Sequence, residues 1–292
     1  MSAQPPSRVI PPTPRGSGRP RPDFADQERN DGALPNAVSL SDRDLHDEVI
    51  RYLTDADARA AESCGGLLDE ADSERAIRFA RFLARRYYRD RLHRAFRHSA
   101  SRIPESRRAD QIVDGPQFDQ VLAKCFLGSL VTAQAVGEMA VATLKPMRHD
   151  VWWNELLQYE YAFFLQLAIS ELEIAGAFPK RGRSNVVRAF TYCIPELLQS
   201  LRSHQVSSEG FQGEVVLSFS RTPHGKIYVV ELESTMRSIL ERIDGASSVA
   251  DIARSAGVSL EEARHSLSRL AELGAVIMAI PAPDDPVLTT DE

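Results

Sequence analysis

The chain has 292 residues, of which 43% are hydrophobic and 26% are charged, with a formal net charge of −6. This length is enough for roughly two domains with sizeable cores. The negative charge argues against a protein whose main work is to neutralise nucleic-acid phosphates. The three cysteines Cys64, Cys125 and Cys193 form no CxxC pair or Cys/His cluster, which argues against a disulfide scaffold and a structural zinc site.

Residues 1–38 contain nearly half of the 17 prolines and few large apolar side chains. Such a segment cannot bury enough surface to offset its ordering entropy, so we predict a disordered tail. The first residues have no apolar stretch typical of a secretory signal, and no apolar run approaches the length of a membrane span. Together with the sparse cysteines, this indicates a soluble cytoplasmic protein.

Residues 39–205 show a helical pattern and form a predicted helical domain. After a first helix around residues 41–53, a long helix is expected from Ser73, as its N-cap, to His98. Its apolar residues Ala76, Phe79, Ala80, Leu83 and Tyr87 fall on one side, and arginines fall on another. The arginine side is a predicted docking surface for an acidic partner, with candidate residues Arg78, Arg81, Arg85 and Arg89; a solvated helix face is the alternative.

Two further helical stretches follow in the same domain. Residues 116–145 predict one or two apolar helices, and residues 150–174 predict a central helix, because this segment is apolar nearly all round. Its glutamates, including Glu155 and Glu160, must then lie in gaps of the packing, pair with arginines, or face a partner.

The pattern changes near Val206. Residues 215–219 and 227–232 predict strands, residues 234–243, 249–256 and 259–273 predict helices, and residues 275–280 predict a returning strand. Ser259 with Glu262 forms a capping box, and Gly274 supplies the C-cap. The predicted fold is mainly α, with a helical domain followed by a small α+β winged-helix-like domain at 206–283 and an acidic tail at 284–292.

A winged helix binds either DNA or a peptide, and the sequence favours a peptide. A DNA reader inserts the N-terminal end of its recognition helix into the major groove, but here that end carries Glu261 and Glu262, which repel phosphates. The other use is strand addition, in which an extended peptide pairs with the edge strand near residues 228–232. We therefore expect no nucleic acid and no membrane among the partners.

The segment 227–232 (Ile-Tyr-Val-Val-Glu-Leu), Ile239-Leu240, residues 243–245, and Leu267 to Val276 resemble the PqqD-like peptide-recognition elements of ribosomal peptide maturation. Members of that family bind the leader of a precursor peptide as an added strand. The resemblance implies peptide binding by residues of the second predicted strand and of the last helix: Tyr228, Val229, Val230, Glu231, Leu232, Arg264 and Ser268.

Residues 153–162 (WNELLQYEYA) and 190–198 (FTYCIPELL) resemble the partner subunits of multinuclear iron oxygenases of the methanobactin and 3-thiaglutamate pathways. In those pairs a TIM-barrel subunit holds the iron, and the partner docks on it and presents a precursor cysteine. The resemblance implies a heterodimer with no cofactor in this chain and iron in the oxygenase subunit. Tyr159 and Glu160 join the four arginines as candidate docking residues.

No catalytic motif is present in the sequence. The seven histidines have no metal-ligand spacing, and the chain has no nucleophile elbow and no phosphate-binding glycine loop. We expect a non-catalytic accessory subunit. The leading alternative is a transcriptional regulator with a DNA-binding winged helix and a helical effector or dimerisation domain; an enzyme with an unfamiliar motif is a third possibility.

Overall fold

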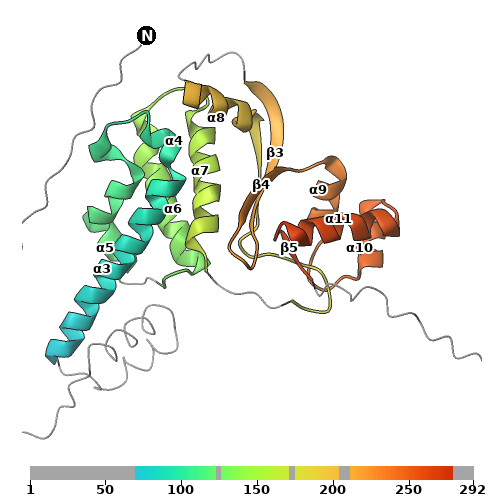
Figure 1. The fold of residues 1–292 in the computed structure, drawn as a ribbon, viewed down its shortest axis with the longest axis horizontal. Coiled ribbons are helices and arrows are strands. Elements are labelled where there is room, and N and C mark those ends of the chain that lie inside the picture. Colours follow the sequence, from blue (N-terminus) through green and yellow to red (C-terminus); the bar gives the residue numbers. More distant parts are fainter. Residues whose placement is uncertain (1–69, 123–125, 171–174, 204–210, 279–292) are drawn as a thin grey trace, which may run out of the picture. The chain divides into compact units, whose positions relative to one another are not determined.

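The computed structural model describes residues 70–122, 126–170, 175–203 and 211–278, and their side chains from Arg78 onward. All of these residues belong to one compact unit, Leu40–Glu292. The predicted tail at 1–38, the first helix around 41–53 and the acidic end at 284–292 lie outside the described residues. The described part is mainly helical with a small antiparallel sheet, which confirms the predicted fold class (Figure 1).

The N-terminal half of the described chain is helical. Its elements are α3 (Glu70–Ala95), α4 (Arg97–Ala100), η1 (Glu105–Arg107), η2 (Ala109–Asp114), α5 (Pro116–Leu122), α6 (Leu130–Leu144), η3 (Lys145–Met147) and α7 (Trp153–Ala168). The predicted helix 73–98 therefore begins earlier and ends earlier than expected, and Ser73 lies inside α3 and is not its N-cap.

Helix α7 is the centre of the larger core, as its apolar composition predicts. It packs against α3 and α6, and its residues Trp153, Leu156, Leu157 and Phe164 are fully or almost fully buried. The approach of α6 requires a glycine, because a Cβ atom at Gly137 would lie 2.4 Å from Cε2 of Tyr161. Small residues on α6 thus let the aromatic side chains of α7 fill the space between the two helices.

A three-stranded antiparallel sheet follows, with the strand order β2 (Val186–Tyr192), β3 (Gln212–Arg221) and β4 (Ile227–Glu231). The strands β3 and β4 were predicted, but β2 lies where only helices were expected and is followed by α8 (Ile194–Ser203). The predicted domain limit at 205/206 therefore falls inside one sheet. The physical reason is non-local, since β2 is held by backbone bonds to β3 from Val186↔Phe219 to Tyr192↔Gln212.

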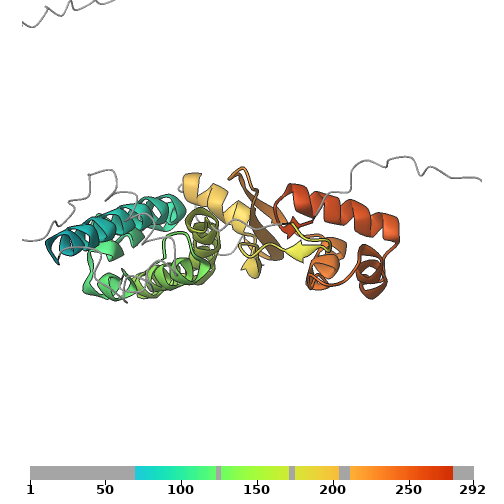
Figure 2. The same ribbon diagram turned by 90° about the horizontal axis from the view of Figure 1, so that it is seen from below.

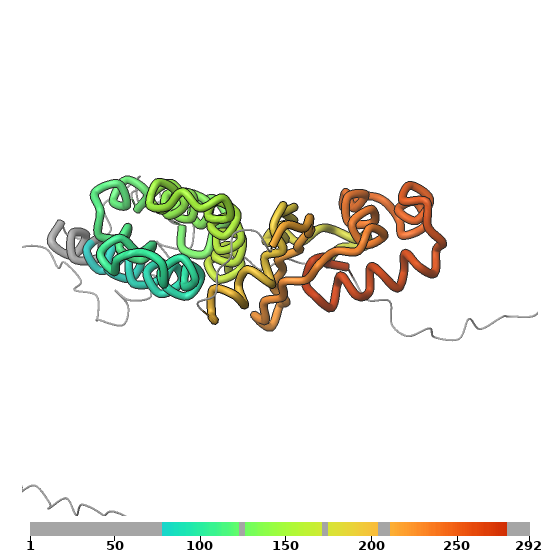
Figure 3. The backbone as a smooth tube through the Cα atoms, turned by 90° about the horizontal axis from the view of Figure 1, so that it is seen from above, coloured from blue at the N-terminus to red at the C-terminus, as the bar shows by residue number. Residues whose placement is uncertain are grey.

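Each face of this sheet packs on a different core. Val215, Leu217 and Phe219 of β3 belong to the cluster around α7, whereas Val187 and Val216 pack against the cluster of the C-terminal helices. Successive residues of a strand point to opposite faces, so one strand supplies both cores. The sheet thus forms a layer between α7 and the C-terminal helices (Figures 2 and 3).

The C-terminal module contains α9 (Ser234–Glu241), α10 (Val249–Ala256), α11 (Leu260–Glu272) and β5 (Val276–Ile277), which pairs with β1 (Lys180–Arg181). Ser259 Oγ accepts the N–H of Glu262, as the capping box predicts. Gly274 has a φ of +76°, and a Cβ atom there would lie 2.5 Å from the carbonyl oxygen of Arg221, so only glycine permits this approach of α11 to β3. Across the described residues, no helix has the length and apolar character needed to cross a membrane.

Candidate binding edge and partner surface

Strand β4 forms one edge of the sheet, and its register decides which backbone groups point outward. The N–H of Leu232 donates to the carbonyl of Val216 at 2.9 Å, and the pairing continues as Val230↔Ser218 and Tyr228↔Ser220. In an antiparallel ladder, residues that bond across to the neighbour alternate with residues that do not. The N–H and C=O groups of Ile227, Val229 and Glu231 therefore point away from β3.

Within the described residues, β3 is the only strand paired with β4. The outward-pointing groups of Ile227, Val229 and Glu231 form a row of donors and acceptors of the kind that pairs with another strand. We call this row the β4 edge. The strand is five residues long, ends in an exposed glutamate, and carries four half-buried apolar or aromatic residues from Ile227 to Val230.

The predicted peptide-binding residues of β4 divide between the two faces of the sheet. Val229 lies opposite Phe219 and packs on the α7 core, while Tyr228 and Val230 point to the face that carries α9–α11. Leu232 is different, because it is only 7% exposed and belongs to the C-terminal core. It donates its N–H to the carbonyl of Val216. Its predicted role as a peptide contact is corrected: it anchors the end of the strand instead.

Arg264 and Ser268 are both exposed on α11, one turn apart. Helix α11 is tied to the sheet at its other end, where Ser220 Oγ donates to the carbonyl of Leu273 at 2.7 Å. Arg264 is nine residues before Leu273, which places it about 13 Å along the helix from that tie. Ser268 is the nearer of the two predicted residues to the sheet.

At the opposite edge of the sheet, Glu155 of α7 covers the C-terminal end of β2. Its carboxylate accepts the N–H of Thr191 at 2.9 Å, the N–H of Tyr192 at 3.0 Å and the hydroxyl of Thr191 at 2.6 Å. Thr191 lies next to Phe190, which pairs with Val215, so its N–H points outward from β2. The glutamate whose position the sequence left open thus accepts the donors of Thr191 and Tyr192 at the end of β2.

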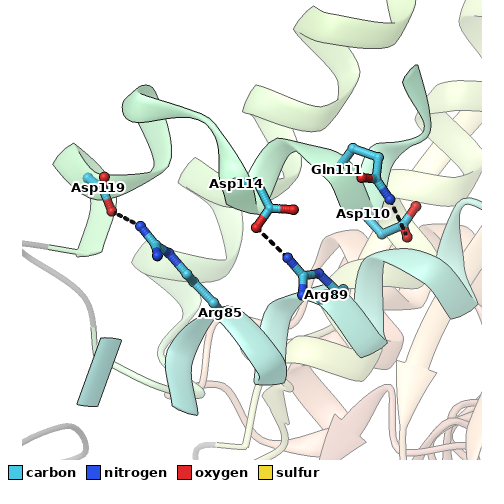
Figure 4. A network of polar contacts seen from close by, with 6 residues as sticks. All are labelled: Arg85, Arg89, Asp110, Gln111, Asp114 and Asp119. Carbon is cyan, nitrogen blue, oxygen red and sulfur yellow. Dashed lines mark hydrogen bonds and ion pairs between the residues drawn. The ribbon is translucent and has the colours of Figure 1, made fainter. Parts of the chain in front are cut away.

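Two of the four predicted docking arginines are engaged within the chain. Arg85 forms an ion pair with Asp119, and Arg89 forms an ion pair with Asp114, both from α3 to the η2–α5 segment (Figure 4). These side chains are between one third and three fifths exposed, so each pair contributes little stability. Their guanidinium groups are nevertheless engaged in these ion pairs. Arg78 and Arg81 are also exposed on α3.

Beside these arginines lies an aromatic residue that the sequence pattern did not single out. The aromatic residue is Phe82, which is 56% exposed and follows Arg81 in the sequence. Arg78 and Arg86 lie four residues before and after Phe82. Residues four apart on a helix share a face. We call Arg78, Arg81, Phe82 and Arg86 the α3 patch. An exposed aromatic among arginines is typical of interface centres, which are enriched in both.

Glu160 is not a surface residue, and its predicted docking role is wrong. Its side chain is fully buried, and Oε1 accepts the N–H groups of His98 at 2.7 Å and Ser99 at 3.0 Å, fixing the junction between α3 and α4. Burial raises the pKa of this carboxyl to about 7, against the opposing effect of these hydrogen bonds. The neighbouring Tyr159 is half-buried and packs edge-on against Phe219, with ring centroids 5.3 Å apart.

Two cavities lie away from the β4 edge. One, of about 480 Å³, lies where the end of α7, the β1–β5 pair and the end of α11 meet, and Arg221 lines it. There Nη1 of Arg221 donates to the carbonyl of Ile169 at 2.6 Å, which caps the C-terminal end of α7. The other, of about 470 Å³, lies before the first turn of α7 and is lined by three arginines.

The described residues contain no group of three or more His, Cys, Asp or Glu side chains arranged to hold a metal ion. Cys193, the cysteine among the described residues, is half-buried and has a free thiol. Its N–H donates to the carbonyl of Phe211 at 2.7 Å, which places it at the end of the sheet. Comparison of the chain with protein-family models and with curated proteins gives no match.

Proposed function

We propose that the chain is a non-catalytic partner subunit that binds the leader of a ribosomal precursor peptide by strand addition and presents the precursor's cysteine to an iron-dependent TIM-barrel oxygenase. The observation that supports it is the asymmetry of the sheet. The outward donors of Thr191 and Tyr192 on β2 are satisfied by Glu155, whereas the outward backbone groups of Ile227, Val229 and Glu231 on β4 have no partner among the described residues.

A peptide on the β4 edge gains affinity from the backbone and sequence preference from side chains. Each added backbone hydrogen bond contributes about 0.5–1.5 kcal/mol net. Alternate peptide side chains then lie beside Tyr228 and Val230 on one face and beside Val229 on the other. This arrangement suits a leader with apolar residues at alternate positions, since the β4 side chains on both faces are only half-buried.

The α3 patch is the proposed docking surface for the oxygenase. Arg78, Arg81 and Arg86 are exposed and positively charged, and Phe82 adds apolar area that a partner can bury. The complementary surface is acidic with an apolar pocket. In this proposal the iron belongs to the oxygenase, and the complex works in the cytoplasm. Anchoring the leader raises the local concentration of the reactive end to the millimolar order for short flexible links.

The proposal is tested by purifying the tagged full chain from its native cells, followed by mass spectrometry and metal analysis. We expect a stoichiometric TIM-barrel protein that carries iron, and a precursor peptide. The double variant Arg81→Glu/Phe82→Ala should reduce recovery of that protein at least tenfold, because it removes both the charge and the apolar contact. Arg254→Glu on α10, an exposed arginine outside the patch, is the matched control. Recovery of the chain alone contradicts the partner role.

A second function is supported by α10 and α11, which are joined by Gly257, Val258 and Ser259 in the manner of a helix-turn-helix. Gly257 has a φ of +71°, as the tight turn requires. In the alternative, α11 reads DNA and the helical part binds an effector. Glu261 and Glu262 are exposed in its first turn, which disfavours contact with phosphates. Duplex binding that falls steeply with salt, by a homodimer, favours the regulator.

A further inference from the structure

The cavity before α7 is a basic hollow built from two distant segments. Arg102 lies in the turn after α4 and Arg107 in η1, and the segment before α7 supplies Met147, Arg148, His149 and Asp150. Its volume is about 470 Å³, and it is wide open to solvent. Neither the β4 edge nor the α3 patch includes any of these residues.

The hollow holds three guanidinium groups and one carboxylate. Asp150 Oδ2 accepts a hydrogen bond from Nε of Arg148 at 2.6 Å, so the charges of these two side chains balance each other. Arg107 Nη1 contacts the thioether sulfur of Met147 at 3.7 Å, a weak acceptor. Arg102 donates from Nη2 to the carbonyl of Leu201 at 3.2 Å, and its buried Nε has no hydrogen-bond partner among the described residues. Arg102 and Arg107 therefore lack a carboxylate partner within the described part of the chain.

The site favours an anion with a particular shape. Asp150 demonstrates that a carboxylate fits against Arg148, and guanidinium groups bind carboxylates in a planar, bidentate manner. Ile103 and Met147 give the hollow an apolar wall that suits the methylene stem of a side chain. Because the hollow is open, it accommodates a group presented on a chain better than it encloses a free metabolite. Helix α7, which has no side-chain N-cap, adds its positive N-terminal end nearby.

We infer that this hollow binds the carboxylate side chain of an acidic peptide segment. The inference is independent of strand addition, because it requires neither β4 nor the oxygenase. In the complex, Arg107 and Arg148 hold the incoming carboxylate, and Arg102 supplies positive charge while it fixes α8. Asp150 is an internal competitor for Arg148, so the incoming carboxylate must displace it or share that guanidinium.

The test uses the full chain and a fluorescein-labelled hexaglutamate peptide in fluorescence anisotropy at low salt, with labelled hexaglutamine as the reference peptide. Arg107→Gln and Arg148→Gln should each weaken hexaglutamate binding about tenfold, since each removes a charge-assisted contact. Asp150→Asn should strengthen binding about threefold, because it releases Arg148. A gain of affinity cannot arise from misfolding, which keeps the test valid if an arginine variant is unstable.

Arg254→Gln on α10, an exposed arginine outside both the hollow and the α3 patch, is the matched control and should change the affinity less than twofold. Arg81→Gln tests whether the peptide uses the α3 patch instead. If it weakens hexaglutamate binding as much as Arg107→Gln does, the peptide binds α3 and the inference is overturned. Equal binding of hexaglutamate and hexaglutamine also overturns it. If inorganic phosphate binds the hollow and hexaglutamate does not, the hollow is a small-anion site and the peptide assignment is wrong.

Discussion

The two edges of the central sheet differ in how their outward-pointing backbone groups are satisfied. The β2 edge ends on a carboxylate from α7, and Glu155 takes up two backbone N–H groups and one hydroxyl there. The β4 edge has no such partner among the described residues. Proteins usually protect sheet edges because an open edge invites pairing with another chain. Glu155 therefore covers the end of the β2 edge, whereas no described residue covers β4, and this difference underlies the proposed strand addition.

The largest effect is expected from prolines at adjacent positions of β4. Val230 bonds inward to Ser218, so Val230→Pro removes ladder bonds and should lower the free energy of unfolding by about 3 kcal/mol or more. Val229 points its N–H outward, so Val229→Pro should cost about 1 kcal/mol and leave the sheet paired. Thermal unfolding of both variants measures the difference. Equal destabilisation contradicts the assigned register.

The same pair of variants separates folding from binding. With the leader of the proposed precursor peptide, folded Val229→Pro should lose at least tenfold in affinity, because the added strand loses the N–H donor of Val229 as a partner and meets the proline ring. Val229→Ala is the control for the lost side chain and should bind more tightly than Val229→Pro. Unchanged binding by Val229→Pro removes the β4 edge from the proposed function.

Glu160, five residues after Glu155 on the same helix, sharpens the comparison through pH. Burial raises the pKa of Glu160 from 4.5 to about 7, so the folded state keeps a proton that the unfolded state loses between these pH values. Stability from this residue is therefore fully present below pH 4.5 and is lost as pH rises to 7. The loss is about 3 kcal/mol, from about 1.4 kcal/mol per pKa unit.

The measurement is urea unfolding of the wild type and Glu160→Gln at pH 4.5, 5.5 and 7. His98 titrates in the opposite sense: burial and Arg97 lower its pKa to about 4, so its stability contribution is lost as pH falls below 6.5. The wild type minus variant difference isolates Glu160 and should fall by about 3 kcal/mol from pH 4.5 to 7. A difference that does not change with pH contradicts a buried, protonated Glu160.

Opening the closed edge should have the next largest effect. Glu155→Ala leaves the N–H groups of Thr191 and Tyr192 without their acceptor and should lower the free energy of unfolding by about 2 kcal/mol. It also exposes two further backbone donors at the end of β2, so size-exclusion chromatography should show concentration-dependent self-association. Asn154→Ala, at the exposed neighbouring position, is the control. A stable, monomeric Glu155→Ala shows that the carboxylate does not protect this edge.

The smallest effect concerns the arginines that the chain already pairs. Arg89→Gln removes an exposed ion pair with Asp114 and should cost about 0.5 kcal/mol in chemical unfolding. It should leave recovery of the proposed oxygenase partner unchanged, in contrast with substitutions in the α3 patch. If Arg89→Gln reduces that recovery as much as Arg81→Glu/Phe82→Ala, docking uses the whole arginine stripe.

The sequence predicts most of the elements whose signals are local. The strands β3 and β4, the cap at Ser259 and the positive-φ glycine at 274 follow from alternation and capping rules. Strand β2 was not predicted, because its pairing with β3 is set by residues about 25 positions away. For the same reason, the sequence cannot decide whether Val229 or Val230 presents its N–H outward, since that depends on the β3–β4 register.

The candidate site is predicted in part. The predicted β4 segment does lie at the edge of the sheet, but Leu232 belongs to the core. Glu160 is buried, which the sequence does not reveal, because the pattern of an aromatic helix does not show which face a glutamate occupies. The sequence analysis did not single out Phe82, because it lies among the arginines of the helix and outside the apolar stripe. The ion pairs of Arg85 and Arg89 depend on where the η2–α5 segment lies, which is a tertiary fact.

Because the two cores share one sheet, a strand bound at β4 would contact residues of both. A strand on β4 lies beside Val229, which contacts the α7 cluster, and beside Val230, whose face carries α9–α11. If binding of a peptide to β4 also tightens the contact of Val229 with the α7 cluster, the two equilibria are coupled, and the coupling free energy is the same in either direction. Binding at the edge would then stabilise the packing of α7, the helix at the centre of the larger core.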